Sequence, residues 1–334
     1  MKIKKIFVYL LVLFILTAFS PSLSFSQTTQ AGNFLEISMV PENPEPLQGV
    51  KLTLKSSAYD LNRSTITWSV DNKVKGTNIG LKELNILAGK NGQKTNIKVS
   101  VKTPNDGEKT LEAFFIPSLV DLIYETHSYV PPFYKGKSLN PNQGVVSVTA
   151  IPELINNQGV RIPTQNILYS WKKDGEVQES SSGVGKNTFT FNGTLPIRDV
   201  IISVNASSLD GNIYAAKQIK ITSIYPKVIF YENHPLYGLM FNQAIKNTVK
   251  MTEAEFSVLA IPYFFSTGYA NNPDIEYNWR MNENSLLNQE PRNAFTAKIE
   301  NTLSGTAGIS LKTSDINRPF QYSSSSFVIN FQKR

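Results

Sequence analysis

The segments ITWSVDNK (66–73), YSWKKDGE (169–176) and YNWRMNEN (277–284) decide the fold that this sequence predicts. They contain all three tryptophans of the 334-residue chain, Trp68, Trp171 and Trp279. A turn-forming pair, Asp-Asn, Asp-Gly or Asn-Glu, begins three residues after each tryptophan. An alternating apolar strand, IKVSV, IISV or GISL, ends 32 or 33 residues after each tryptophan. Landmarks that recur at nearly constant spacing indicate one structural unit used three times.

A unit of this length with short alternating strands is typical of an immunoglobulin-like β-sandwich. We therefore predict an all-β chain of three tandem sandwiches, at residues 33–117, 118–223 and 224–334. The composition agrees, because 41% hydrophobic and 18% charged residues are ordinary for a globular protein. No linker rich in glycine and serine separates the units, and Pro117 and Pro226 stand at the junctions. Short junctions that contain proline predict a stiff rod.

Each tryptophan is predicted to fill the core of its sandwich, since an indole can bridge much of the roughly 10 Å between two sheets. The predicted partner lies across the core on the strand that ends 32 or 33 residues later. The chain contains no cysteine, so apolar packing alone must hold the sandwiches together. The aliphatic residues predicted to make these contacts are Val99, Val101, Ile202, Val204, Ile309 and Leu311.

The pattern of tryptophan, turn, VSV-type strand and a later Asp-Gly hairpin resembles the tandem PKD-like and immunoglobulin-like domains of bacterial surface or secreted proteins. The resemblance covers residues 33–332, and the Asp-Gly hairpins begin at Asp106 and Asp210. The PKD sequence W-D-F-G-D-G is absent, so only the tryptophan and its turn are kept. The resemblance implies an extracytoplasmic structural, spacing or adhesive role without catalysis. It transfers no functional residue, because its motifs are common to the whole fold.

The N-terminus has the three parts of a secretory signal peptide. Three lysines within the first five residues precede an apolar run at residues 6–19, and Ser24 and Ser26 supply small residues around a cleavage site. We predict a signal peptide at residues 1–26 and an extracytoplasmic location, which is secreted, periplasmic or at the cell surface. The alternative is an uncleaved anchor at residues 6–25, the one part of the chain that would then contact a membrane. The apolar run is shorter than the roughly 20 residues that span a bilayer.

The charge of the chain argues against nucleic acid as a partner. The formal net charge is +7, from 33 basic and 26 acidic residues. Removal of the three leader lysines leaves 30 basic residues against 26 acidic ones. This small excess is spread along the chain, without the basic runs that bind a phosphate backbone.

The two histidines are the strongest catalytic candidates, because His127 and His234 each follow a glutamate by two residues. Glu-x-His on a strand places both side chains on one face, which suits metal binding or acid–base chemistry. A zinc site needs three or four ligands, and the sequence offers no further histidine, cysteine or acidic cluster nearby. Motifs for a hydrolase serine, a phosphate loop and a calcium loop are also missing. We therefore predict no enzymatic activity, no catalytic residue, no metal and no cofactor.

The segment SYVPPFYKGKSL (128–139) is the candidate binding surface. Its prolines predict a loop, on which Tyr129, Phe133 and Tyr134 beside Lys135 suit a glycan face or an envelope protein. The alternative is that these rings pack into the junction with the preceding sandwich. The matching part of the third unit carries Tyr237, Met240 and Phe241.

The function expected from these observations is that of an exported, non-enzymatic structural, spacer or adhesion protein of the bacterial cell envelope. The alternative is a carbohydrate-binding surface protein that uses the aromatic loop. Solvent exposure of the rings distinguishes the two, because sugar binding needs open rings and a structural joint needs covered ones.

Overall fold

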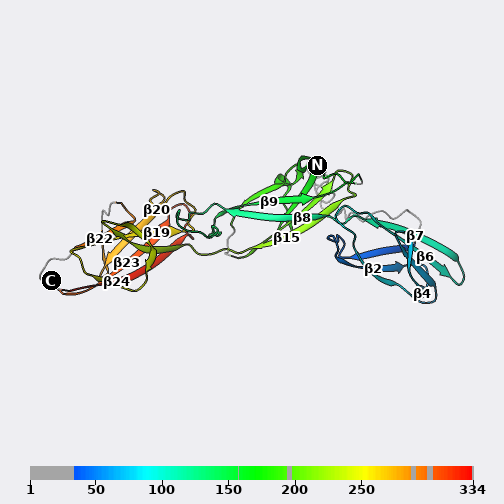
Figure 1. Ribbon diagram of the computed structural model, residues 1–334, viewed down its shortest axis with the longest axis horizontal. Helices are drawn as coiled ribbons and strands as arrows, with labels where there is room; N and C mark the ends of the chain where they lie inside the picture. The colour runs from blue at the N-terminus through cyan, green and yellow to red at the C-terminus, as the bar shows by residue number, and fades with distance from the viewer. Residues whose placement is uncertain (1–33, 157, 194–197, 287–290, 299–303, 333–334) are drawn as a thin grey trace, which may run out of the picture. The chain divides into compact units, whose positions relative to one another are not determined.

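The chain is built from β-sheets, as the computed structural model in Figure 1 shows. The structure describes residues 34–156, 158–193, 198–286, 291–298 and 304–332, so the predicted signal peptide lies outside it. Throughout these ranges the only helical turns are two 3-10 turns, η1 (Thr164–Asn166) and η2 (Glu179–Ser181). A search of the same ranges finds no helix with the length and apolarity to cross a membrane.

The first sandwich consists of a three-stranded sheet, β1-β2-β5, and a four-stranded sheet, β4-β3-β6-β7. Trp68 lies on β3 of the larger sheet, and the proline-rich stretch at 41–48 forms the loop between β1 and β2. The strands are β1 (Leu35–Val40), β2 (Gly49–Ser56), β3 (Thr65–Val70), β4 (Lys73–Ile79), β5 (Glu83–Leu87), β6 (Thr95–Thr103) and β7 (Gly107–Phe115).

The second sandwich repeats this arrangement with sheets β13-β9-β8 and β11-β10-β14-β15, and β12 also pairs with β10. Its strands are β8 (Leu119–Thr126), β9 (Val145–Glu153), β10 (Ile167–Lys173), β11 (Glu176–Val177), β12 (Gly183–Val184), β13 (Thr188–Asn192), β14 (Val200–Ser208) and β15 (Tyr214–Ile221).

The third sandwich adds two strands to the same plan. Its sheets are β17-β16-β19-β22 and β18-β24-β23-β20-β21, in which β18 runs parallel to β24. The strands are β16 (Lys227–His234), β17 (Gly238–Ile245), β18 (Thr248–Met251), β19 (Glu255–Tyr263), β20 (Ile275–Met281), β21 (Asn284–Ser285), β22 (Ala294–Lys298), β23 (Gly305–Asp315) and β24 (Tyr322–Phe331).

This layout is that of tandem immunoglobulin-like sandwiches, which confirms the predicted fold class. Each copy has one sheet with the order β1-β2-β5, β8-β9-β13 or β16-β19-β22, and in its other sheet the tryptophan strand pairs with the first strand of the long hairpin. The chain divides into two compact units. One reaches to Glu42 and includes Gly49–Leu87 and Lys94–Phe115, and the other contains Asn43–Gln48, Ala88–Gln93 and everything from Ile116 onward. The second and third sandwiches therefore belong to one compact unit.

The three tryptophans are fully buried, each at the same point of its sandwich. The strand that ends 32 or 33 residues later is the hydrogen-bonded neighbour in the same sheet, with Trp68 opposite Val99 and Trp171 opposite Val204. The prediction that this strand lies across the core was therefore wrong. The contacts across the core are aromatic, for example with Phe189, whose ring centroid lies 5.8 Å from that of Trp171.

Each indole N–H donates a hydrogen bond to a backbone carbonyl of its own sandwich. Trp68 donates to the carbonyl of Leu81 at 2.8 Å, and Trp171 donates to that of Lys186 at 2.8 Å. The third copy repeats this bond, and in all three the acceptor stands two residues before the strand that closes the smaller sheet. A buried indole N–H needs a hydrogen-bond acceptor. This bond therefore fixes the orientation of the ring and the position of the segment that supplies the carbonyl.

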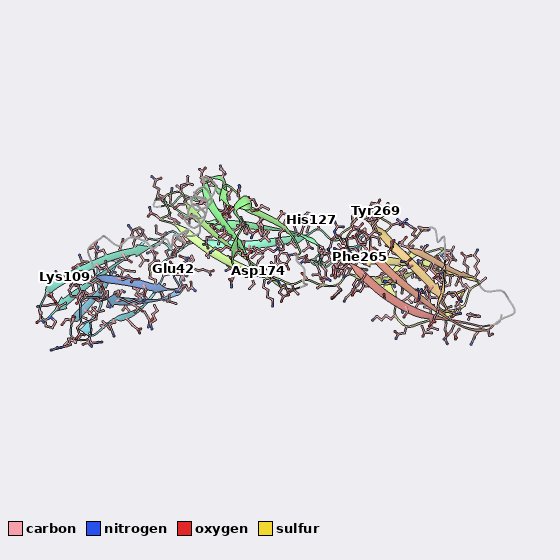
Figure 2. All side chains as sticks on the ribbon, turned by 180° about the vertical axis from the view of Figure 1, so that it is seen from behind. Glu42, Lys109, His127, Asp174, Phe265 and Tyr269 are labelled. Carbon is pink, nitrogen blue, oxygen red and sulfur yellow. The ribbon has the colours of Figure 1, made fainter. Side chains whose placement is uncertain are left out.

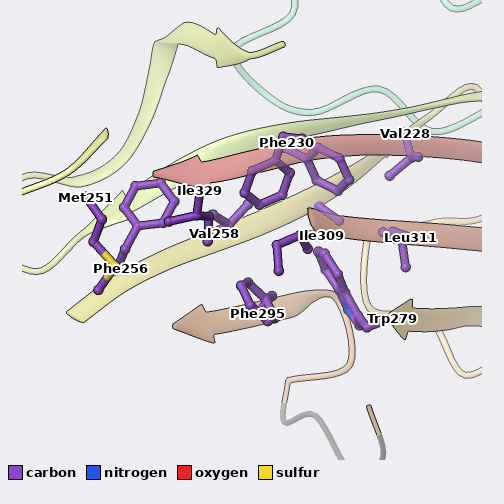
Figure 3. Close-up of a cluster of buried hydrophobic side chains, with 12 residues drawn as sticks. Val228, Phe230, Met251, Phe256, Val258, Trp279, Phe295, Ile309, Leu311 and Ile329 are labelled. Carbon is purple, nitrogen blue, oxygen red and sulfur yellow. The ribbon is translucent and has the colours of Figure 1, made fainter. Parts of the chain in front are cut away.

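Figure 3 shows the core of the third sandwich, where Trp279 lies between Phe230 and Phe295. The ring centroids of these neighbours lie 5.6 and 5.5 Å from that of the indole. Both come from the opposite sheet, on β16 and β22. The aliphatic residues Ile309 and Leu311 on β23 complete the wall beside the tryptophan.

The turn after each tryptophan is a tight reversal with two residues in the left-handed region. The first turn residue then binds the neighbouring long strand. The Asp174 carboxylate accepts the N–H of Ile201 at 2.9 Å, and the Asn282 side chain accepts the N–H of Gly308 at 2.9 Å. Asp71 does the same to Asn96. The recurring Asx residue is therefore a structural clamp as well as a turn former.

Candidate functional site: an aromatic segment on the third sandwich

The predicted binding segment lies in the loop between β8 and β9, and we call residues 129–134 the aromatic segment. Its backbone is paired with the third sandwich, because the N–H of Tyr129 donates to Phe265 and the carbonyl of Tyr129 accepts from Phe264. These bonds measure 2.8 and 2.7 Å. Figure 2 labels His127, just before the segment, and Phe265, which receives it.

The rings of the aromatic segment contact four rings of the third sandwich. Phe133 meets the edge of Tyr231 at 5.5 Å between centroids and stacks on Phe241 at 4.8 Å, with 13° between the planes. Tyr134 meets Tyr263 edge-on at 5.6 Å, and it also meets Phe264 at 5.8 Å. Tyr129, Phe133 and Tyr134 are consequently half-buried, whereas Lys135 is exposed.

The surface beneath the segment is the outer face of the sheet β17-β16-β19-β22. Along β16, Val228 and Phe230 point into the core, so Tyr231 points to the opposite side. Ile261 and Tyr263 on β19 lie on this outer side as well. All three outer residues are nearly inaccessible to solvent. The third sandwich is therefore covered on a face that an antiparallel sheet usually leaves to water.

Sequence reasoning placed the alternative contact of these rings at the junction with the preceding sandwich, whereas the rings contact the following one. The reason lies in the course of the chain. The loop between β8 and β9 pairs with Ile224, which follows the last strand of the second sandwich, so this loop lies where the chain passes into the third sandwich. The sequence does carry a signal for this surface, because IFYEN and VLAIPYFF are apolar at both alternating positions. Strands of that kind are covered on both faces.

Two tyrosine hydroxyls close the buried end of the cluster. The hydroxyls of Tyr231 and Tyr263 lie 2.8 Å apart. Burial raises the pKa of Tyr263 well above its ordinary value, and the hydrogen bond from Tyr231 adds to the rise. Burial also raises the pKa of Tyr129. Burial therefore favours the neutral, hydrogen-bonding form of Tyr129 and Tyr263.

A buried glutamine of the third sandwich binds the same loop. The amide nitrogen of Gln321 donates to the carbonyl of Asn142 at 2.7 Å and to the hydroxyl of Ser266 at 2.8 Å. Its oxygen accepts the N–H of Ser266 at 2.8 Å. Gln321 is fully buried, so each of these bonds avoids the cost of an unpaired polar group.

An internal ion pair holds the loop that carries this glutamine. The Asp315 side chain is inaccessible to solvent, and one of its oxygens lies 3.1 Å from the guanidinium of Arg318. Its other oxygen accepts the backbone N–H groups of Asn317 and Arg318. Arg318 also donates to the carbonyl of Ser266 at 3.3 Å. The loop between β23 and β24 is thus braced from within by Asp315 and Arg318.

The chain between the second and third sandwiches is paired as well. Ile224 donates to the carbonyl of Asn140 at 2.9 Å, and its own carbonyl accepts the N–H of Asn142 at 3.1 Å. The side chain of Asn140 donates to the hydroxyl of Ser223 at 3.1 Å. Backbone bonds, rings and buried amides therefore converge at this one joint.

Exposed apolar side chains remain on the hairpin between β16 and β17. Leu236 is 83% exposed and Tyr237 is 75% exposed, while Phe241 on β17 is 56% exposed. His234 fixes the tip, because its Nδ1 accepts the N–H groups of Leu236 and Tyr237 and its ring lies 4.7 Å from that of Tyr237. This histidine is thus occupied in a turn. His127 is exposed, with its Nε2 3.3 Å from the hydroxyl of Ser147.

Charged side chains around this joint are engaged by neighbouring residues. The Asp315 carboxylate binds Arg318, and Lys137 lies over the ring of Tyr124, 3.4 Å from its centre. Across the described ranges no set of three histidine, cysteine or acidic side chains is placed to hold a metal ion.

Comparison with known proteins finds no matching family model and no matching curated protein. Among solved structures, the chain is similar to fibronectin(III)-like modules of CbhA from Clostridium thermocellum, at 12% identity over 56% of this chain and 94% of that one, with a TM-score of 0.26. It is similar to three N-terminal domains of the bacteriophage RB49 capsid protein Hoc, at 14% identity over 90% and 99%, with a TM-score of 0.26. A third is SGBP-B of Bacteroides ovatus, solved with a mixed-linkage heptasaccharide, at 12% identity over 93% and 70%, with a TM-score of 0.22. With TM-scores this low, the function must be argued from the residues of this chain.

Proposed function

We propose that this chain is an exported, non-enzymatic spacer or adhesion protein of the bacterial cell envelope, built from PKD-like sandwiches. The observation that carries the proposal is the use of the aromatic segment. Its rings, which were the best candidates for an external ligand, bind the third sandwich of the same chain. The joint they form holds two sandwiches in one arrangement, which is what a spacer requires.

The contacts of the joint are numerous enough to restrict it. Aromatic pairs such as Phe133 with Tyr231 each contribute about 0.5 to 1.5 kcal/mol beyond the area they bury. Net contributions of about 0.5 to 1.5 kcal/mol for each hydrogen bond, such as those of Tyr129 and Gln321, add to this. These contributions oppose the conformational entropy that a free linker would keep.

Export is supported by the leader-like sequence at residues 1–26. The lack of cysteine suits an exported bacterial envelope protein better than a eukaryotic secreted one. The non-enzymatic assignment is supported by how the titratable groups of the joint are used. Asp315 and the buried tyrosines act as structural partners, and their chemistry is directed at neighbouring protein atoms. The membrane contact in this proposal is limited to the N-terminal segment.

The test is the relative motion of the second and third sandwiches in the full chain, read from amide ¹⁵N relaxation. The proposal expects one shared rotational correlation time for both sandwiches. Phe133→Ala combined with Tyr134→Ala should separate the two values, whereas Tyr237→Ala, which removes an exposed ring from the same sandwich, should leave them joined. Two independent correlation times in the native chain would count against a spacer.

A carbohydrate-binding role is the second candidate, and a specific observation favours a place for it. Phe241 and Tyr237 keep open ring surface, at 56% and 75% exposure, on the third sandwich. A glycan array with the full chain, repeated with Tyr237→Ala and with Phe241→Ala, tests this role. Binding that both substitutions weaken would support it, and binding unaffected by either would contradict it.

A further inference from the structure

The outer face of the sheet β17-β16-β19-β22 has the character of a ligand site. Tyr231, Ile261 and Tyr263 on this face are 7%, 5% and 5% exposed because the aromatic segment covers them. Without the segment, these side chains would form a continuous apolar patch on a solvent-facing sheet. Patches of this kind mark interaction surfaces.

The segment is held through its backbone as well as through its rings. Tyr129 forms two backbone hydrogen bonds, one with Phe264 and one with Phe265. The segment then turns at Pro132 and Phe133, because the N–H of Tyr134 donates to the carbonyl of Pro131 at 2.9 Å. Pro131 is buried, and the two prolines restrict the backbone before binding, so the turn loses little conformational freedom when it docks.

Side-chain recognition is directional as well. Phe133 fits between an edge-on contact to Tyr231, with 74° between the planes, and a parallel stack on Phe241. Tyr134 meets both Tyr263 and Phe264 edge-on, at 83° and 78°. The site therefore requires two adjacent aromatic side chains, each in its own orientation. It would discriminate between peptide sequences and would not bind every apolar segment.

The receiving loop depends on its occupant. Phe264 has a φ of 63°, a left-handed value that is strained for a bulky residue. Its N–H donates to Tyr129, and its ring meets Tyr134, so both of these contacts come from the aromatic segment. Strain of this kind persists where neighbouring contacts maintain it. The loop shape and the bound segment therefore support each other.

From these contacts we propose that the outer face of the third sandwich is a peptide-binding site for a Tyr-x-Pro-Pro-Phe-Tyr segment with a turn at its second proline, filled in the native chain by residues 129–134. The site recognises side chains and backbone together, and it can bind the same sequence supplied as a separate molecule once its own segment is disabled. This inference rests on the proposed spacer role and extends it by assigning the joint a specific ligand.

The experiment uses the full chain with Tyr129→Ala, Phe133→Ala and Tyr134→Ala, here called the emptied chain. The probe is a fluorescent peptide of sequence HSYVPPFYKGKS, which is residues 127–138, with blocked ends. A tethered ligand acts at an effective concentration of about millimolar, so the native chain should exclude the peptide at tens of micromolar. We expect the emptied chain to bind it at least about tenfold more tightly than the native chain does.

Two controls define the site. A peptide with alanine in place of the Phe-Tyr pair should lose binding, and Tyr231→Ala added to the emptied chain should also abolish it. Where the emptied chain has a melted third sandwich, the chain with Phe133→Ala alone replaces it, and binding is read as peptide-induced protection of β16 and β19 from hydrogen exchange. Equal binding to native and emptied chains, equal binding of the alanine peptide, or no binding and no protection would each overturn the proposal.

Discussion

Replacement of Trp171 by phenylalanine isolates the role of the indole N–H in the second sandwich. The indole donates to the carbonyl of Lys186 at 2.8 Å and lies against Phe189, and the residue is fully buried. Phenylalanine keeps an aromatic ring in the core, but it removes the donor and leaves part of the indole volume empty. The Lys186 carbonyl then has no partner from the side chain at this position.

The expected loss of stability follows from two contributions. A buried carbonyl left unpaired costs about 1 to 3 kcal/mol. The missing atoms of the larger ring add about 1 to 2 kcal/mol, at roughly 0.8 kcal/mol for each buried carbon group. Together these predict a loss of about 2 to 5 kcal/mol for Trp171→Phe. Trp171→Ala should exceed this, since removal of a buried aromatic side chain alone costs about 3 to 5 kcal/mol.

The assay is hydrogen exchange of β14 in the full chain as the temperature is raised, because β14 reports on the second sandwich alone. In a domain of this size, each kcal/mol lowers the midpoint by about 4 to 8 °C. Trp171→Phe should therefore lower it by at least about 8 °C. Leu168→Ala, on the same strand but 42% exposed, is the matched control and should have little effect. A shift below about 4 °C for Trp171→Phe would refute the reasoning.

Three further predictions concern single residues. Glu283, at φ 69° in the turn after Trp279, should stabilise the third sandwich by about 0.5 to 1 kcal/mol when changed to glycine, measured as a higher unfolding midpoint. Asp315→Asn should destabilise it by about 1 to 3 kcal/mol in urea unfolding, because an amide donor then faces Arg318. The hydroxyl of Ser208 lowers the pKa of Asp210 in the folded protein. Ionised Asp210 therefore stabilises the second sandwich above the pKa that it has in the unfolded chain, and this stability is lost as the pH falls through the lower pKa of the folded state. Asp210→Asn should flatten the pH dependence of the second sandwich below about pH 4.

The repeated elements could be predicted because each depends on residues close in sequence. Trp171, the turn at Asp174 and the alternation of β14 each carry a local signal, and together they specify the tryptophan sheet of the sandwich. The indole acceptor could not be predicted, since Lys186 contributes only its backbone carbonyl. A carbonyl carries no mark in the sequence.

The candidate site was predictable in part. Its rings were singled out by their number and by the prolines beside them, and Tyr129, Phe133 and Tyr134 do lie together. What they contact was not predictable from the loop itself, because Tyr231 and Tyr263 lie about a hundred residues further along the chain. The strands that carry those residues are apolar on both faces, and this pattern was the sequence signal that the sheet is covered on both sides. The parallel pairing of β18 with β24 had no comparable signal, since β18 contains four residues.

The most direct test of the joint is hydroxyl-radical footprinting of the tyrosines in the native full chain. The account predicts that Tyr237, at 75% exposure, is oxidised rapidly, that Tyr263, at 5%, is protected, and that Tyr134 falls between them. Phe133→Ala should raise the oxidation rate of Tyr231, whose ring Phe133 contacts, and leave that of Tyr237 unchanged. Oxidation of Tyr134 and Tyr263 at the rate of Tyr237 in the native chain would contradict the docked segment, and with it the proposed spacer.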